Sequence, residues 1–163
     1  TTDAPTALLL SRQNLPPLSR SAQAKAQIRQ GGYVLSKAAG GKPDIVLIAT
    51  GSEVELALKA QSALAGQDIV AWVVSMPSTT TFDRQSLEYQ HSVLPPKIRR
   101  VAIEAAAGDF WRKYVGLSGA VIGLSHFGES APAETLYEEF GITVDAIVDA
   151  VSRTLEMEAG IVE

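Results

Sequence analysis

The sequence has 163 residues, of which 46% are hydrophobic and 20% are charged, and its formal net charge is −4. These values are typical of a globular protein of about one domain and exclude an intrinsically disordered chain. The sequence contains no cysteine. That absence excludes a disulfide scaffold, cysteine-ligated zinc, iron–sulfur clusters and thiol catalysis.

Charge is distributed unevenly along the chain. Residues 129–163 carry nine acidic side chains and one basic side chain, whereas residues 1–32 carry one acidic and four basic side chains. The acidic end would repel a phosphate backbone, so we expect no nucleic-acid partner. The sequence has no long uncharged apolar run and no signal-peptide pattern at its start. We therefore expect no membrane partner and a cytoplasmic location.

The first 32 residues differ in composition from the rest. The apolar run at residues 7–10 predicts a short buried strand that leads into a polar loop. Residues 16–32 contain Pro16–Pro17 and Gly31–Gly32 among many polar side chains, which predicts a linker. We expect the main domain to begin at Tyr33.

The main domain alternates apolar segments with amphipathic ones. The first two apolar segments are joined through Gly40–Gly41–Lys42–Pro43, a connection so short that the two strands are expected to be antiparallel. The segment IVAWVVSM is apolar almost throughout, as in a strand covered on both faces. Strands are expected at 33–38, 45–49, 69–76, 100–105 and 120–124.

Helical patterns fill the intervals between these strands. Ser52 and Glu55 match the S-x-x-E capping box at the start of a helix that stops at Gly66. Thr143 is expected to cap the last helix, whose apolar residues recur at helical spacing. Other helices are expected within 82–94, 110–115 and about 132–140. This alternation predicts an α/β fold: a three-layer open sheet of about five strands, four parallel and one antiparallel at the edge, with helices on both faces.

The common sequence motifs of catalytic and nucleotide sites are missing. No G-x-G-x-x-G follows a strand, and Lys42 is followed by proline rather than serine or threonine, so neither a dinucleotide site nor a phosphate loop is predicted. The segment Gly123–Gly128 has the spacing G-x-S-x-x-G, which is one residue too long for a nucleophile elbow.

Several single residues remain candidates, each with a structural alternative. Glu104 ends a predicted strand and could be an acid of raised pKa, or a carboxylate that caps a helix or anchors a loop. The Gly51–Ser52 turn could hold an anion, although the capping box would already satisfy its amides. His91 and His126 are better explained as hydrogen-bonded structural residues.

Arg12 is the most informative candidate, because it directly follows the predicted strand at 7–10. A guanidinium held by a rigid backbone can bind a phosphate or carboxylate with two parallel hydrogen bonds. The pattern alone also allows a surface residue or an ion-pair partner. From spacing alone the ligand of Arg12 therefore stays open.

Six segments resemble the transketolase family in order and spacing over nearly the whole chain. The resemblance covers the C-terminal part of such an enzyme. The segments are Ser11–Pro16 (SRQNLP), Thr50–Val54 (TGSEV), Val73–Ser78 (VVSMPS), Trp111–Gly116 (WRKYVG), Phe127–Pro132 (FGESAP) and Phe140–Thr143 (FGIT).

This resemblance implies a homodimeric, cytoplasmic enzyme of the pentose phosphate pathway that uses thiamine diphosphate and magnesium. Such an enzyme transfers a two-carbon ketol unit from a ketose phosphate, such as xylulose 5-phosphate, to an aldose phosphate, such as ribose 5-phosphate. The resemblance assigns Arg12 to the substrate's phosphate. It assigns no catalytic, cofactor or metal residue to this chain.

The resemblance also implies a domain division. Residues 1–15 are expected to be the terminal strand and loop of a preceding pyrimidine-binding domain, residues 16–32 a linker, and residues 33–163 the C-terminal domain. The chain would then supply scaffold, dimer contacts and one substrate arginine, partner the remaining transketolase domains, and be inactive alone. The alternative is an independent small-ligand-binding or regulatory α/β module.

Overall fold

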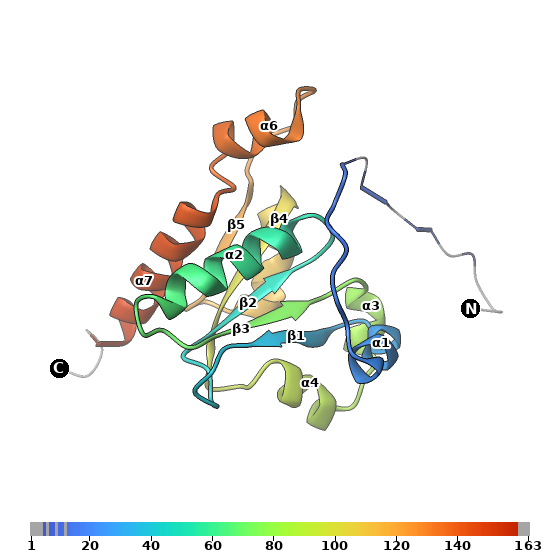
Figure 1. The fold of residues 1–163 in the computed structure, drawn as a ribbon, viewed down its shortest axis with the longest axis vertical. Helices are drawn as coiled ribbons and strands as arrows, with labels where there is room; N and C mark the ends of the chain where they lie inside the picture. Colours follow the sequence, from blue (N-terminus) through green and yellow to red (C-terminus); the bar gives the residue numbers. More distant parts are fainter. Residues whose placement is uncertain (1–4, 6, 9, 12, 160–163) are drawn as a thin grey trace.

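The computed structural model describes the whole chain except residues 1–4, 6, 9, 12 and 160–163. Its centre is a five-stranded sheet in the order β1-β3-β2-β4-β5, in which β1 is antiparallel and the other strands are parallel (Figure 1). The predicted fold class, including the antiparallel edge strand, is confirmed. The strands are β1 (Tyr33–Lys37), β2 (Ile45–Ala49), β3 (Ala71–Ser75), β4 (Arg99–Ala107) and β5 (Ala120–Leu124).

Helices cover both faces of this sheet (Figure 1). On one face α2 (Glu53–Ala65) and α7 (Val144–Ala159) pack over Leu47 and its neighbours. The opposite face carries Val46 and Ile48 against short helices. Every residue of β2 is fully buried, which explains its unbroken apolar sequence. The short helices are α3 (Thr79–Asp83), α4 (Leu87–Val93), η2 (Gly108–Trp111) and α5 (Arg112–Val115).

The last helix forms as its sequence predicts. The amide of Ala146 donates to the Thr143 hydroxyl at 3.2 Å, so Thr143 is the N-cap. Ile147 and Val151 of α7 are fully buried against the sheet. Within the described residues, no helix is long and apolar enough to cross a membrane.

The strands β1 and β2 run in opposite directions, as predicted, but they are not neighbours. β3 lies between them, and β1 pairs with it from Tyr33 opposite Ser75 to Lys37 opposite Trp72. Adjacent strands are about 4.8 Å apart, so the connection at 38–44 is long enough to step across one strand. The sequence pattern could not distinguish this arrangement from a hairpin.

The segment predicted as a linker at 16–32 contains helix α1 (Ala22–Gln27) and a 3₁₀ turn, η1 (Ile28–Gln30), which the sequence pattern did not predict. Its assignment as a linker stays a prediction. Ser21 caps α1 by accepting from the amide of Ala24 at 3.1 Å. The sequence AQAKAQ consists of good helix formers but has no apolar stripe, and so it lacks the periodicity by which a helix is recognised.

Gly31 ends this turn and joins it to β1 in a conformation that only glycine fits. Its φ is +86°, and an added Cβ would lie 2.3 Å from the carbonyl oxygen of Ser78 and 2.5 Å from the amide nitrogen of Phe82. The Gly31 carbonyl also accepts from the Ser78 amide at 2.9 Å. Gly31 therefore fixes how the N-terminal segment enters the sheet.

The described residues of the buried strand expected at 7–10 are not in a strand. Residues 7, 8 and 10 have no regular secondary structure, and Leu8 and Leu10 are 80% and 78% exposed. A strand needs a neighbour to satisfy its backbone groups, and these residues lie outside the sheet of this chain. The assignment of residues 1–15 to a preceding domain stays a prediction.

Candidate functional site

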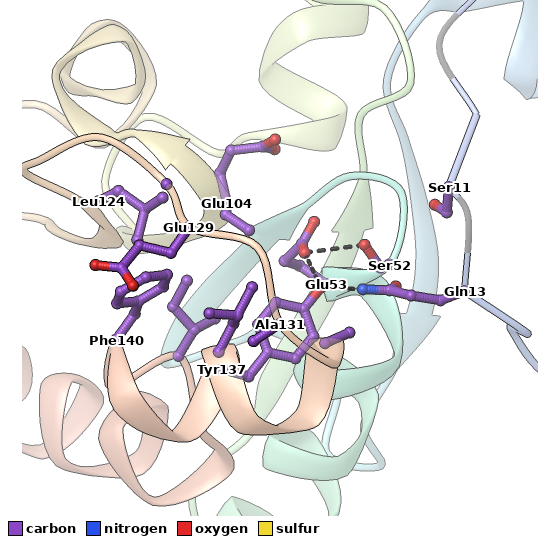
Figure 2. Close-up of a pocket in the computed structure, with 15 residues that line it drawn as sticks. Ser11, Gln13, Ser52, Glu53, Glu104, Leu124, Glu129, Ala131, Tyr137 and Phe140 are labelled. Atoms are coloured by element: carbon purple, nitrogen blue, oxygen red, sulfur yellow. Dashed lines mark hydrogen bonds between the residues drawn. The ribbon is translucent and has the colours of Figure 1, made fainter.

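A pocket of about 640 Å³ lies at the carboxyl ends of β2, β4 and β5, beside α6 (Ala133–Glu139) (Figure 2). Carboxyl ends of parallel strands meet at one edge of a sheet, which is where such folds bind ligands. The N-terminal segment and the start of α2 also reach this pocket. Its polar side chains are Ser11, Gln13, Ser52, Glu53, Glu104, Glu129 and Tyr137.

Glu53 is the most buried acidic side chain of the pocket. It is 3% exposed and stands at the first turn of α2. Its carboxylate accepts from the Ser52 hydroxyl at 3.0 Å and from the hydroxyl of Tyr137 on α6 (Figure 2). These two donors offset the cost of removing a carboxylate from water.

Tyr137 connects Glu53 to the N-terminal segment. Its hydroxyl oxygen lies 3.5 Å from Nε2 of Gln13, which donates to it. Burial, followed by the hydrogen bond to Glu53, raises the pKa of Tyr137. The hydroxyl therefore stays protonated at neutral pH and can donate to Glu53 while it accepts from Gln13.

Glu104 has the raised pKa that its strand-end position suggested. Burial, followed by the negative charge of Glu53, raises the pKa of Glu104 to about 7. Its Oε2 atom is buried without a hydrogen-bond partner among the described residues. This carboxyl is therefore partly protonated near neutral pH.

The capping box predicted for α2 is wrong. Ser52 has helical backbone angles, φ −66° and ψ −32°, and its side chain caps no amide. Glu55 instead forms an ion pair with Lys59 at 2.7 Å. With these backbone angles the Ser52 side chain does not cap the helix, and its hydroxyl donates to Glu53 instead. That buried carboxylate also makes the Gly51–Ser52 turn unfavourable for an anion.

Neither of the two histidine candidates lines this pocket. Arg12, the predicted phosphate ligand, lies outside the described residues, although its neighbours Ser11 and Gln13 line the pocket. His126 is exposed, with Nδ1 2.7 Å from the Phe127 carbonyl oxygen and its ring packed edge-on against Phe140. His91 is exposed on α4, on the other face of the sheet. The contacts with Phe127 and Phe140 support a structural role for His126.

The donor set of the pocket does not suit a diphosphate or a metal ion held by several protein ligands. Its lining includes Glu53, Glu104 and Glu129 and, among the described residues, no lysine or arginine. In the part of the chain that the structure describes, no group of three or more histidine or acidic side chains could bind a metal. The described part of the lining therefore favours neutral or cationic groups.

Glu53 and Tyr137 are the residues that the sequence reasoning missed. They are 84 positions apart, and no spacing motif joins them. The sequence feature that could have identified Glu53 as a site residue is its position as an acidic residue directly after a buried strand and turn.

Comparison with known proteins gives a consistent family. Residues 31–143 match the family described as Transketolase-like TK C-terminal domain. Transketolase 1 of Escherichia coli is 56% identical over 147 residues, covering 90% of this chain and 22% of that protein. The chain thus spans about a fifth of the length of the curated relatives that it matches.

Solved structures agree with the sequence comparison. A Pichia stipitis transketolase in complex with sedoheptulose 7-phosphate is 40% identical with a TM-score of 0.79, and the match covers 91% of this chain and 21% of that one. A split-gene transketolase, described as an inactive β4 tetramer, is 26% identical with a TM-score of 0.65, over 89% of this chain and 48% of that one. From its motifs, its sheet and these matches, the chain belongs to the transketolase family and contains that family's C-terminal domain.

Proposed function

We propose that this chain forms the C-terminal part of a transketolase, which transfers a two-carbon ketol unit from a ketose phosphate to an aldose phosphate. The observation that carries the proposal is the 56% identity to Escherichia coli transketolase 1 over 147 residues. The Pichia stipitis relative solved with sedoheptulose 7-phosphate supports sugar phosphates as the substrate class. We further propose that the whole enzyme is a cytoplasmic homodimer of the pentose phosphate pathway.

Thiamine diphosphate and magnesium would be held by other domains of that enzyme. The cofactor, when bound, supplies the electron sink for cleavage of the carbon–carbon bond. The pocket described here carries three glutamates, which would repel a diphosphate. We therefore derive no reaction step through the cofactor on the residues of this chain.

The chain would contribute a scaffold, dimer contacts and Arg12. A guanidinium offers a planar fork of donors that matches a phosphate group. Residues 1–32 carry four basic side chains and one acidic side chain, so the sequence around Arg12 is more favourable for a sugar phosphate than the acidic pocket is.

The test compares the chain alone with the full-length enzyme that contains it. Each is incubated with xylulose 5-phosphate, ribose 5-phosphate, thiamine diphosphate and magnesium, and sugar products are quantified. We expect repeated turnover by the full-length enzyme and none by the chain, in line with the inactive split-gene tetramer. Turnover by the chain alone, or an inactive full-length enzyme, would contradict the proposal.

An independent ligand-binding module is the second candidate, and the pocket of about 640 Å³ is the observation in its favour. Its acidic lining disfavours sugar phosphates and nucleotides as ligands. A thermal-shift screen of the chain with both classes tests this module. We expect no shift that depends on the pocket, and a shift abolished by Glu53→Gln would favour the module instead.

A further inference from the structure

A continuous series of hydrogen bonds joins three distant parts of the chain at the edge of the sheet. Gln13 donates from the N-terminal segment to the hydroxyl of Tyr137 on α6, at 3.5 Å. Tyr137 donates to Glu53 on α2, and Ser52 donates to the same carboxylate at 3.0 Å. Figure 2 shows these side chains meeting beside the pocket.

Two members of this series are held independently of the N-terminal segment. Glu53 is 3% exposed and is fixed between the Ser52 and Tyr137 hydroxyls. A tyrosine hydroxyl that donates its single proton still has lone pairs that can accept. The hydroxyl oxygen of Tyr137 is therefore held in place as an acceptor, and Nε2 of Gln13 donates to it.

Among the described residues near this point, Gln13 makes the side-chain hydrogen bond that joins the N-terminal segment to α6. Residues 13–20 form no helix or strand, and Asn14 to Pro17 are exposed. Further along the chain, Leu18 packs against the core on the α2 and α7 face, and Nε of Arg20 donates to the Tyr33 hydroxyl at 2.9 Å. The Ser11 hydroxyl oxygen lies 4.0 Å from where a Cβ on Gly51 would be, so the segment also approaches the turn before α2.

Arg12 stands between Ser11 and Gln13 in the sequence. We propose that Tyr137 and Glu53 are positioning residues that hold the segment on either side of Arg12 against the C-terminal domain, so that its guanidinium can meet the substrate's phosphate. This inference rests on the proposed function, because it requires that Arg12 binds that phosphate. It assigns Tyr137 and Glu53 no contact with substrate or cofactor.

Positioning of this kind has a distinct kinetic signature. If Gln13 loses its acceptor, the segment samples more conformations, and binding of a phosphorylated donor weakens in proportion to the competent fraction. A ketose without a phosphate does not use Arg12, so its binding should not change. The chemical step takes place on other domains and should keep its rate.

The test uses the full-length holoenzyme with Tyr137→Phe, which removes only the hydroxyl. We expect the KM for xylulose 5-phosphate to rise about 3- to 10-fold, as for the loss of one hydrogen bond. The kcat, and the KM for the unphosphorylated ketose erythrulose, should stay within about two-fold of the parent enzyme. Glu53→Gln keeps an oxygen that can accept from Tyr137, and it should remain nearer the parent than Tyr137→Phe.

Tyr89→Phe is the matched control. It also removes one tyrosine hydroxyl, which donates to the Gly32 carbonyl at 2.8 Å on the other face of the sheet. We expect it to leave the ratio of the two KM values unchanged. An equal effect of Tyr89→Phe would mean that both variants merely loosen the domain, and would overturn the inference.

Arg12→Ala separates this inference from the function on which it rests. If Arg12→Ala does not raise the KM for the phosphorylated donor selectively, the proposed phosphate role of Arg12 is wrong. If it does so and Tyr137→Phe does not, the positioning role is wrong while the proposed function stands. Adding Tyr137→Phe to Arg12→Ala should give no further rise, and an additive rise would show that Tyr137 acts by another route.

Discussion

At the carboxyl edge of the sheet, burial of Glu104 and then the negative charge of its neighbour Glu53 raise the pKa of Glu104 to about 7. The two glutamates reach this edge from consecutive parallel neighbours in the sheet, because Glu53 follows β2 and Glu104 lies in β4. The Glu104 carboxyl therefore binds its proton more tightly in the folded chain than in the unfolded chain, where its pKa is near 4.5.

The first prediction concerns the pH dependence of stability. A raised pKa stabilises the fold below the unfolded value, and this contribution is lost as pH rises towards the folded value. Between pH 4.5 and 7, the free energy of unfolding should fall relative to that of Glu104→Gln by about 1–2 kcal/mol, after allowance for solvent screening. Urea unfolding of both proteins from pH 4.5 to 8 measures the difference. Parallel pH profiles would contradict the prediction.

The second prediction concerns the turn at Gly31. Gly31→Ala should lower the free energy of unfolding by about 2–4 kcal/mol, because it combines an unfavourable φ with a backbone clash. Gly41 has φ +89° but an open surrounding, so Gly41→Ala should cost only about 1 kcal/mol. Gly128 has neither constraint, and Gly128→Ala should be near neutral. Thermal or urea unfolding measures these changes. If Gly31→Ala and Gly41→Ala lowered the free energy of unfolding equally, the backbone near Gly31 would have shifted to accommodate the added Cβ, and the prediction would be wrong.

The third prediction concerns Arg100, whose guanidinium binds three main-chain carbonyl groups. It donates to the carbonyl of Tyr114 at 2.6 Å and to those of Leu94 and Pro95 at 3.1 Å each. Lysine cannot reproduce this fork, so Arg100→Lys should cost about 2–3 kcal/mol of stability. Arg112, which is exposed and donates at 3.5 Å, gives the matched control: Arg112→Lys should cost less than about 0.5 kcal/mol.

The fourth prediction separates a working helix cap from one that the sequence only suggested. Thr143 caps α7, so Thr143→Ala should cost about 1 kcal/mol. Glu55 forms a partly exposed ion pair with Lys59, so Glu55→Gln should cost about 0–0.5 kcal/mol, and less at high salt. If Glu55→Gln lowered the free energy of unfolding as much as Thr143→Ala, Glu55 would act as a capping residue after all, and the prediction would be wrong. Urea unfolding at low and high salt makes the comparison.

Elements determined by local sequence were predictable. The apolar runs of β2 and β3 identified buried strands, and Thr143 with the stripe through Ile147 and Val151 identified α7. In each case the signal lies within one segment and depends on burial or capping. The same reasoning missed α1, since its alanines and glutamines form no apolar stripe.

Properties that depend on where elements meet were not predictable. The connection at 38–44 fits a hairpin or a step across one strand, so the neighbour of β1 could not be chosen. At the site, the strand-end position of Glu104 suggested its raised pKa. The bond from Tyr137 to Glu53 depends on where α6 packs, which no pattern near either residue encodes.

The reversed direction of β1 has a geometric consequence for the polypeptide that precedes it. Tyr33, the first residue of β1, pairs with Ser75, the last residue of β3, so the chain arrives on the same rim of the sheet as the pocket. Had β1 run the other way, its first residue would lie at the far rim, about 13 Å away at about 3.3 Å per residue. The N-terminal segment would then have to run the full length of the strands before it reached Tyr137. Because the edge strand β1 is antiparallel, the N-terminal segment and the pocket lie at the same rim of the sheet.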